Sequence, residues 1–135
     1  MSRYASLRAS EVNLRVGPGE QYPIAWVYHR PGLPLEITAE FDVWRHVRDW
    51  QGEEGWVHSN MLSTQRTVIV IDGVQSLRKK PSDASAVVAT AETGVVARLL
   101  RCPKGTPWCQ IEVDGMRGWA PRVHIWGIQK GETVD

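Results

Sequence analysis

The sequence predicts an all-β protein made of two tandem, small five-stranded barrels that pack on each other. Three observations lead to this fold class. One motif occurs twice, the β-prone runs are short and separated by tight turns, and no stretch shows sustained helical periodicity. About five short strands are too few for a sandwich and suit a small closed barrel.

The repeat is clearest in Gly55–Leu62, which reads Gly-Trp-Val-His-Ser-Asn-Met-Leu. Moving 63 positions along the chain gives Gly118-Trp119-Ala120, with Ile125 where Leu62 stood. In each copy the glycine is expected to let the backbone turn before a short strand begins.

The repeat predicts domains at residues 1–63 and 64–128, followed by a flexible tail at 129–135. The connector Ser63-Thr64-Gln65 reaches at most about 10 Å. We therefore expect the two domains to share an apolar interface and to unfold together.

The first copy begins with a mixed stretch, Arg3–Ser10. Its counterpart Arg66–Gly73 is a plain strand signal, with β-favouring residues closed by a turn pair. Two glycines and two prolines rule out helix in Arg15–Pro23, which is predicted to be a long loop. The other strands of this copy are expected at Val12–Leu14, Ile24–Tyr28, Leu35–Ala39, Trp44–Arg48 and Gly55–Val57.

The second copy repeats this plan, but its loop at Arg78–Asp83 has lost both glycines. Asp114-Gly115 has the composition of a hairpin turn. Strands are expected at Val87–Ala91, Val96–Cys102 and Trp108–Val113.

The composition excludes several classes of partner. The formal net charge of +1 gives no electrostatic reason to bind nucleic acid. No run approaches the ~18 apolar residues of a membrane span, so membrane insertion is not expected. Met1–Tyr4 contains no apolar signal core. The protein is therefore either cytoplasmic or a mature periplasmic or cell-envelope form whose export signal was removed.

The sequence contains no enzymatic constellation. The four histidines, at positions 29, 46, 58 and 124, lie on different predicted strands and turns and lack the spacing of metal ligands. No serine or cysteine stands in a nucleophile motif. We therefore expect no enzymatic activity, no cofactor and no metal.

Cys102 and Cys109 flank the predicted loop Pro103–Pro107 at the base of a hairpin, where antiparallel partners can come within bonding distance. A disulfide is favoured in an exported protein, and two buried thiols are favoured in the cytosol. Cys109 shares the strand parity of Ile111 and Val113, which are expected to face the core.

Arg15 and Arg78 recur beside a core leucine in the two copies. One interpretation is a cation that binds ligand. The other is a bridge from the long loop to backbone carbonyls or a carboxylate. The second is favoured because the arginine persists in the degraded second loop.

Three motifs resemble a bacterial Src-homology-3 domain. The resemblance covers about residues 3–62 with specific motifs and 66–126 with weaker ones. The motifs are Leu14-Arg15-x-Gly17-Pro18-Gly19-x-x-Tyr22-Pro23, Trp44-x-x-Val47 and Gly55-Trp56-Val57-x-Ser59-x-x-Leu62.

This resemblance implies a five-stranded barrel of two orthogonal sheets, with a 3₁₀ turn near Ser59-Asn60, and no catalytic activity. Such domains commonly serve exported or envelope proteins and bind peptide or peptidoglycan-like ligands. Trp44 matches the ligand tryptophan of the eukaryotic relatives, which bind proline-rich peptides. His58 and Met61 stand where those relatives carry proline and tyrosine, and these two departures argue against a proline-rich ligand.

Several aromatic residues of the first copy have no aromatic counterpart in the second, so the barrel does not need them. At the 63-residue offset, Tyr22 becomes Ser85, Trp26 becomes Ala89, Tyr28 becomes Ala91, Trp50 becomes Val113 and Asn60 becomes Val123. We assign ligand binding to the first copy, at Tyr22, Trp44, Trp50 and Asn60, with the three rings gathered on one side. Trp26 and Tyr28 share strand parity and are alternatively assigned to the contact between the copies.

The leading functional hypothesis is a non-catalytic module that binds a peptide, a cell-wall component or another protein in the cell envelope. Two alternatives stay open. A small β-barrel with exposed aromatics could bind single-stranded nucleic acid, although the near-neutral charge argues against it. The chain could also be the targeting fragment of a cell-wall hydrolase.

Overall fold

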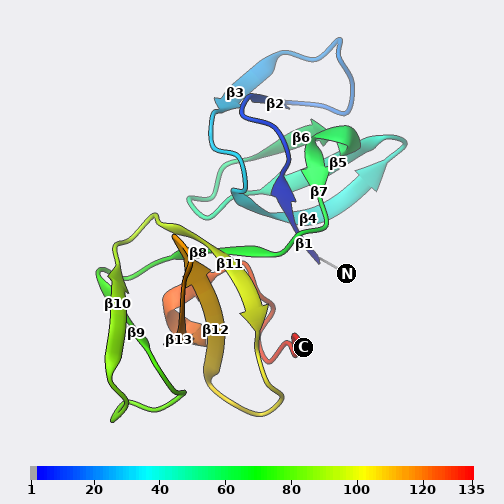
Figure 1. Ribbon diagram of the computed structural model, residues 1–135. Coiled ribbons are helices and arrows are strands. Elements are labelled where there is room, and N and C mark those ends of the chain that lie inside the picture. Colours follow the sequence, from blue (N-terminus) through cyan, green and yellow to red (C-terminus); the bar gives the residue numbers. More distant parts are fainter. Residues whose placement is uncertain (1–2) are drawn as a thin grey trace. The chain divides into compact units, whose positions relative to one another are not determined.

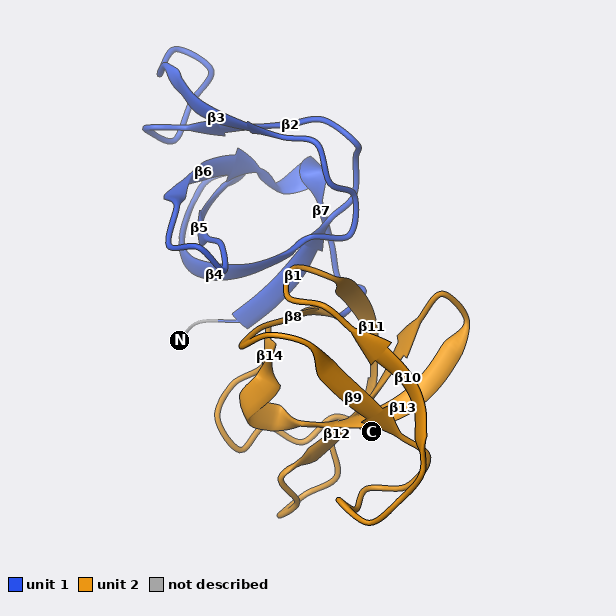
Figure 2. Ribbon diagram, turned by 90° about the vertical axis from the view of Figure 1, so that its left-hand side faces the viewer, with its two compact units in different colours: residues 1–66 blue, residues 67–135 orange. Residues whose placement is uncertain are grey.

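The computed structural model describes residues 3–135 and divides the chain into two compact units, residues 1–66 and 67–135 (Figure 2). Each unit is an antiparallel β structure with one short 3₁₀ turn (Figure 1). In the described part of the chain, no helix has the length and hydrophobicity to cross a membrane. The predicted all-β class is confirmed.

The first unit has seven strands in one sheet, with the spatial order β3-β2-β6-β5-β4-β1-β7. A single 3₁₀ turn, η1 (Ser59–Met61), joins β6 to β7. The strands are β1 (Arg3–Leu7), β2 (Val12–Arg15), β3 (Ile24–Tyr28), β4 (Pro34–Phe41), β5 (Trp44–Arg48), β6 (Glu54–His58) and β7 (Leu62–Ser63).

The second unit repeats this topology with the order β10-β9-β13-β12-β11-β8-β14. Its 3₁₀ turn, η2 (Arg122–His124), again precedes the last strand. The strands are β8 (Thr67–Val70), β9 (Gln75–Arg78), β10 (Val87–Ala91), β11 (Val96–Arg101), β12 (Trp108–Val113), β13 (Met116–Pro121) and β14 (Ile125–Trp126).

Each unit has seven strands instead of the five expected of a small barrel, because the two arms of the long loop, which are predicted as strands, count in addition to the five strands of the barrel. In the first unit these arms, β2 and β3, pair with each other, and β2 meets the barrel where Arg15 lies opposite Trp56. Instead of two separate orthogonal sheets, hydrogen bonds join all seven strands into one. A bulge in β4 between Ile37 and Ala39 increases the local twist and helps this sheet to curl.

The alternation of side chains along each strand determines which residues form the two hydrophobic cores. In the first unit Leu14, Leu35, Val47 and Val57 are fully buried. Asn13 on β2 and Glu54 on β6 are exposed, whereas Glu36, next to Leu35 on β4, is buried and pairs with Arg48. Cys109 and Ile111 share parity on β12 and are both fully buried in the core of the second unit, whereas Val113 is half-buried and packs against that core. The same apolar pattern therefore builds two separate small cores.

The repeated glycines Gly55 and Gly118 serve a different purpose from the predicted one. Neither is among the residues with positive φ, and both are buried inside strands. A Cβ at Gly55 would lie 2.7 Å from the Arg15 carbonyl oxygen and 2.7 Å from Leu14 Cγ. A Cβ at Gly118 would lie 2.6 Å from Leu77 Cβ. The glycines are needed for the close approach of the long-loop arm to the barrel, so the prediction of a backbone turn is wrong.

Candidate functional site

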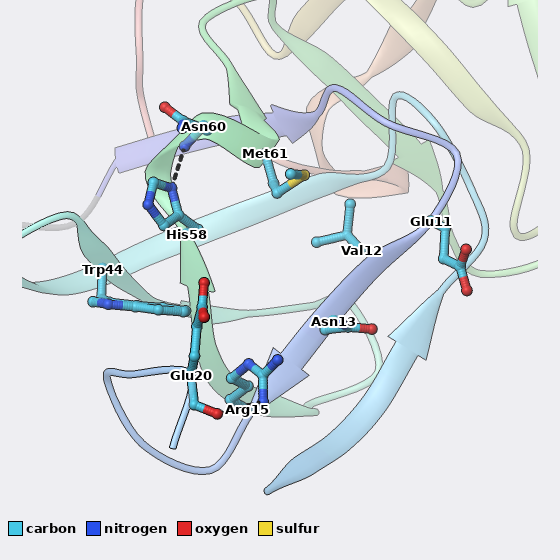
Figure 3. Close-up of a pocket in the computed structure, with 9 residues that line it drawn as sticks. All are labelled: Glu11, Val12, Asn13, Arg15, Glu20, Trp44, His58, Asn60 and Met61. Carbon is cyan, nitrogen blue, oxygen red and sulfur yellow. Dashed lines mark hydrogen bonds between the residues drawn. The ribbon is translucent and has the colours of Figure 1, made fainter. Parts of the chain in front are cut away.

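The first unit contains a groove of about 330 Å³ between the long loop and the barrel. One wall comes from β2 and the loop that follows it, and the other from the start of β5 and the η1 turn (Figure 3). The lining residues are Glu11, Val12, Asn13, Arg15, Glu20, Trp44, His58, Asn60 and Met61.

Trp44 and His58 form the floor of one end of the groove. They lie opposite each other in the register of β5 and β6, with their ring centroids 5.3 Å apart in an edge-to-face arrangement. His58 also caps η1, because its Nδ1 accepts a hydrogen bond from the Asn60 backbone N–H at 3.0 Å. This bond places the N–H of the neutral imidazole on Nε2 and fixes the ring beside Trp44.

The long loop is braced by Arg15. Its Nη1 donates to the carbonyl oxygens of Glu20 at 3.1 Å and Tyr22 at 2.9 Å. In the second unit Arg78 Nη1 donates in the same way to the Ser85 carbonyl oxygen at 3.0 Å. The interpretation of these arginines as bridges to loop carbonyls is confirmed, and the brace holds Glu20 at the groove.

The electrostatic character of the groove is acidic. Glu11 and Glu20 contribute two carboxylates against the single guanidinium of Arg15, which is occupied by loop carbonyls. Figure 3 shows Glu11 at the end of the groove away from Trp44, and the Glu20 carboxylate directed toward the Trp44–His58 end. A ligand with positive charge near both ends would match this arrangement.

The structure brings together only part of the predicted site. Trp44 and Asn60 line the same groove, but Tyr22 does not. The Tyr22 ring packs on Gly17, where an added Cβ would lie 2.5 Å from ring atoms. Trp50 lines a different cavity, beyond the other end of β5. The expected single cluster of Tyr22, Trp44 and Trp50 is therefore not formed.

Besides Arg15, six residues that line the groove are not among the predicted site residues: Glu11, Val12, Asn13, Glu20, His58 and Met61. His58 and Met61 flank Ser59-Asn60, and the sequence marks them only as departures from the family pattern. Glu11 and Glu20 lie on segments that approach Trp44 only after folding, and an isolated acidic residue in a loop carries no signal of its own.

The second unit uses the corresponding positions differently. Trp108 lies opposite Pro121, in the register that Trp44 and His58 occupy in the first unit. At the 63-residue offset, Glu11 becomes Val74 and Asn60 becomes Val123. One carboxylate and one amide of the first groove are thus replaced by apolar side chains, whereas Glu20 keeps an acidic counterpart in Asp83 and Asn13 a polar one in Ser76.

Pro121 and Val123, the counterparts of His58 and Asn60, line a cavity of about 400 Å³ in the second unit. This unit also carries a C-terminal strap, residues 129–135. Cys102 and Cys109 form a disulfide that closes the loop between β11 and β12. Cys102 then exchanges two backbone hydrogen bonds with Val134, at 2.7 and 2.9 Å. Residues 129–135 are predicted to be a flexible tail, but within them Val134 pairs with Cys102 and packs against the core.

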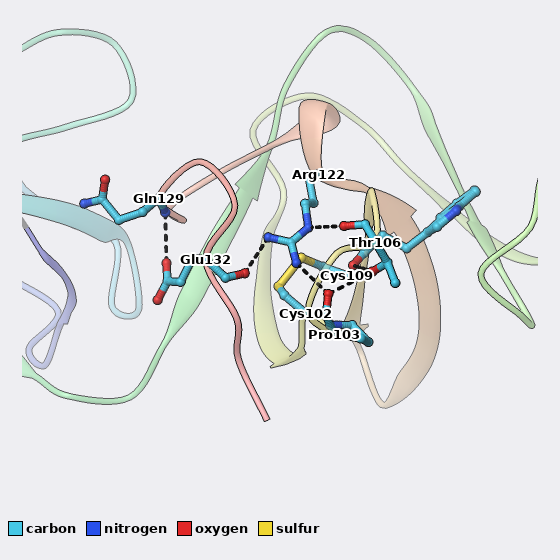
Figure 4. Close-up of a disulfide and its surroundings, with 8 residues drawn as sticks. Cys102, Pro103, Thr106, Cys109, Arg122, Gln129 and Glu132 are labelled. Atoms are coloured by element: carbon cyan, nitrogen blue, oxygen red, sulfur yellow. Dashed lines mark hydrogen bonds between the residues drawn. A yellow bond between two sulfur atoms is a disulfide. The ribbon is translucent and has the colours of Figure 1, made fainter.

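Arg122 connects the disulfide loop to the C-terminal strap (Figure 4). Its Nε donates to the Thr106 carbonyl oxygen at 2.6 Å and its Nη2 to that of Pro103 at 3.0 Å. Its Nη1 donates to the carbonyl oxygen of Glu132. One guanidinium therefore joins two segments far apart in the sequence.

Removal of the disulfide is expected to lower the free energy of unfolding by about 2–3 kcal/mol, because a cross-link across a short loop restricts the unfolded chain. The variant is Cys102→Ala with Cys109→Ala, measured by chemical denaturation against the oxidised protein. Thiol titration of the unfolded, unreduced protein should find no free thiol. Two reactive thiols would contradict the disulfide.

Within residues 3–135, no group of three or more histidine, cysteine or acidic side chains could hold a metal ion. The groove offers hydrogen-bonding groups and aromatic surface.

Comparison with known proteins agrees with the fold. The family model described as bacterial SH3 domain matches the chain twice, at residues 8–64 and 72–127. No curated protein sequence matches the chain. Two similar solved structures are NlpC1 and NlpC2 from Trichomonas vaginalis, with 12% and 11% sequence identity and TM-scores of 0.43 and 0.41. Each match covers 93% of this chain but only 45% and 48% of those chains, so this chain spans less than half their length.

Proposed function

Because the chain belongs to the bacterial SH3 domain family, with one domain in each half, we propose that it is a non-catalytic module that holds a peptide ligand in the groove of its first domain. The family consists of binding domains that are typically non-catalytic. The observation that carries the proposal is the groove itself, where an aromatic floor at Trp44 and His58 lies beside two carboxylates.

The groove favours an extended peptide with a free amino group. The Trp44 ring offers a flat apolar surface for a side chain, and the amides of Asn13 and Asn60 can exchange hydrogen bonds with a peptide backbone. Glu11 and Glu20, at opposite ends of the groove, would each pair with an ammonium group of the peptide. The same carboxylates argue against the nucleic-acid alternative, because phosphates require a basic surface.

We place this module in the cell envelope and take peptides of the cell wall as its ligand class. The disulfide supports this location, since disulfides form and persist in oxidising compartments outside the cytoplasm.

Binding of soluble stem peptides released from purified peptidoglycan tests this function. Trp44→Ala is expected to weaken binding by tenfold or more in isothermal titration calorimetry, because about 1.4 kcal/mol of contact with the ring is lost. Combined Glu11→Gln and Glu20→Gln should weaken binding about tenfold, and acetylation of the peptide amino groups should do the same.

The matched control is Phe41→Ala, because Phe41 is 59% exposed and does not line the groove. This variant should bind as the unaltered protein does. Equal binding by the Trp44 variant would contradict the site, and undiminished binding of acetylated peptides would contradict the ammonium specificity.

A further inference from the structure

The first unit has a second cavity, of about 380 Å³, which the peptide groove does not explain. It is formed by the end of β3, the turn that follows it, and the hairpin at residues 49–53. Trp44 begins β5 and Trp50 follows its end, so the two cavities lie near opposite ends of this strand. The five residues of β5 span roughly 15 Å of extended chain.

The base of this cavity is rigid. The carboxylate of Asp49, only 5% exposed, accepts hydrogen bonds from the Tyr28 hydroxyl at 2.8 Å and from the backbone N–H groups of Gln51 and Glu53 at 2.9 and 3.0 Å. Burial, together with the bond to Asp49, raises the pKa of the Tyr28 hydroxyl, which therefore stays a donor. These bonds fix the hairpin that carries Trp50.

The aromatic surface above this base is not required by the fold. The second unit builds the same strand order with Ala89, Ala91 and Val113 at the positions of Trp26, Tyr28 and Trp50. Trp26 is also 52% exposed, although it lines the cavity. A large exposed ring that is absent from the second copy of the barrel is typical of a binding surface.

The polar groups around the two indoles can exchange hydrogen bonds with a ligand rich in hydroxyl groups. Gln51 offers both donors and acceptors, and Glu53 offers acceptors opposite Arg30 on the facing turn. The buried carboxylate of Asp49 is already occupied by three donors. Both cavities are lined by two carboxylates and one guanidinium, and the pair of indole rings distinguishes this one from the peptide groove.

We propose that this cavity is a second binding site, which takes a neutral pyranose ring of an oligosaccharide. A pyranose has an apolar C–H face that stacks on an indole and a rim of hydroxyl groups that exchange hydrogen bonds with groups such as Gln51 and Glu53. Trp26 and Trp50 provide the stacking surface. The proposal does not depend on peptide binding at Trp44.

Indole NMR resonances can test the site directly. The chain has seven tryptophans, each with one indole N–H signal, and the Trp26→Ala, Trp44→Ala and Trp50→Ala variants assign three of them. Titration with β-1,4-linked tetramers of N-acetylglucosamine and of glucose should give saturable shifts at Trp26 and Trp50 and none at Trp44. Each alanine variant should weaken the affinity for the sugar about tenfold, as expected for one lost stacking contact.

Two further measurements keep the test decisive. Phe41→Ala, an exposed aromatic outside both cavities, should leave sugar binding unchanged. Gln51→Ala, which leaves both rings in place, should weaken sugar binding without moving the indole signals of the free protein. The proposal is overturned if neither sugar gives saturable shifts, if the shifts appear at Trp44 instead, or if a neutral proline-rich peptide shifts Trp26 and Trp50 while the sugars do not.

Discussion

Replacing Gly55 by alanine is expected to lower the free energy of unfolding by about 2–4 kcal/mol. The reason is overpacking, because the surrounding atoms cannot move away from an added methyl group. In a strand interior, alanine would ordinarily be the better residue. Here its Cβ would lie 2.7 Å from the Arg15 carbonyl oxygen and from Leu14 Cγ, and Leu14 is fully buried. The long-loop arm would have to separate from β6.

Chemical denaturation of the full chain, followed by tryptophan fluorescence, measures this effect. Gly52→Ala is the matched control, because a Cβ there meets nothing within 4 Å and only the positive φ of +89° is unfavourable. Gly52→Ala should lower the free energy of unfolding by about 1–2 kcal/mol. If Gly55→Ala costs no more than Gly52→Ala, close packing is not the reason for the glycine in the repeat.

Arg122→Ala should lower the free energy of unfolding by about 3 kcal/mol, since hydrogen bonds from a charged group contribute about 1.5–3 kcal/mol each and are not additive. The substitution leaves the carbonyl oxygens of Pro103, Thr106 and Glu132 without this donor. The strap would lose its tie at Glu132 and would be held to the disulfide loop only by the backbone pair of Val134 with Cys102 and by packing.

The control is Arg117→Ala, which removes an exposed ion pair with Glu112 and should cost less than about 0.5 kcal/mol. Arg122→Lys keeps the charge but not the planar guanidinium and should recover only a minor part of the loss. Equal stabilities of the Arg122→Ala and Arg117→Ala variants in chemical denaturation would show that the strap is held by other contacts.

The features that the sequence predicted correctly depend on local patterns. Strand positions follow from alternation and turn residues, the duplication from a fixed offset, and the family from motifs such as Gly55-Trp56-Val57. The bridging role of Arg15 could also be inferred, because the two copies act as an internal comparison.

The features that the sequence did not predict depend on which strands become neighbours in the fold. Trp44 and Trp50 are close in the chain, yet the strand between them carries the two rings to different cavities. Glu20 reaches the groove only because Arg15 braces the loop. Arg122 replaces Ser59 of the first copy, but nothing in the sequence shows that three carbonyl oxygens converge on it.

The order of strands has one consequence for how the protein behaves in concentrated solution. β3 ends the hydrogen-bonded order of its sheet, and β10 ends that of the other. Both are edge strands, and their sequences, Ile-Ala-Trp-Val-Tyr and Val-Val-Ala-Thr-Ala, contain neither a charge nor a proline to deter pairing with another chain. The resistance of this protein to aggregation is therefore set at these two edges, independently of how stably its cores are packed.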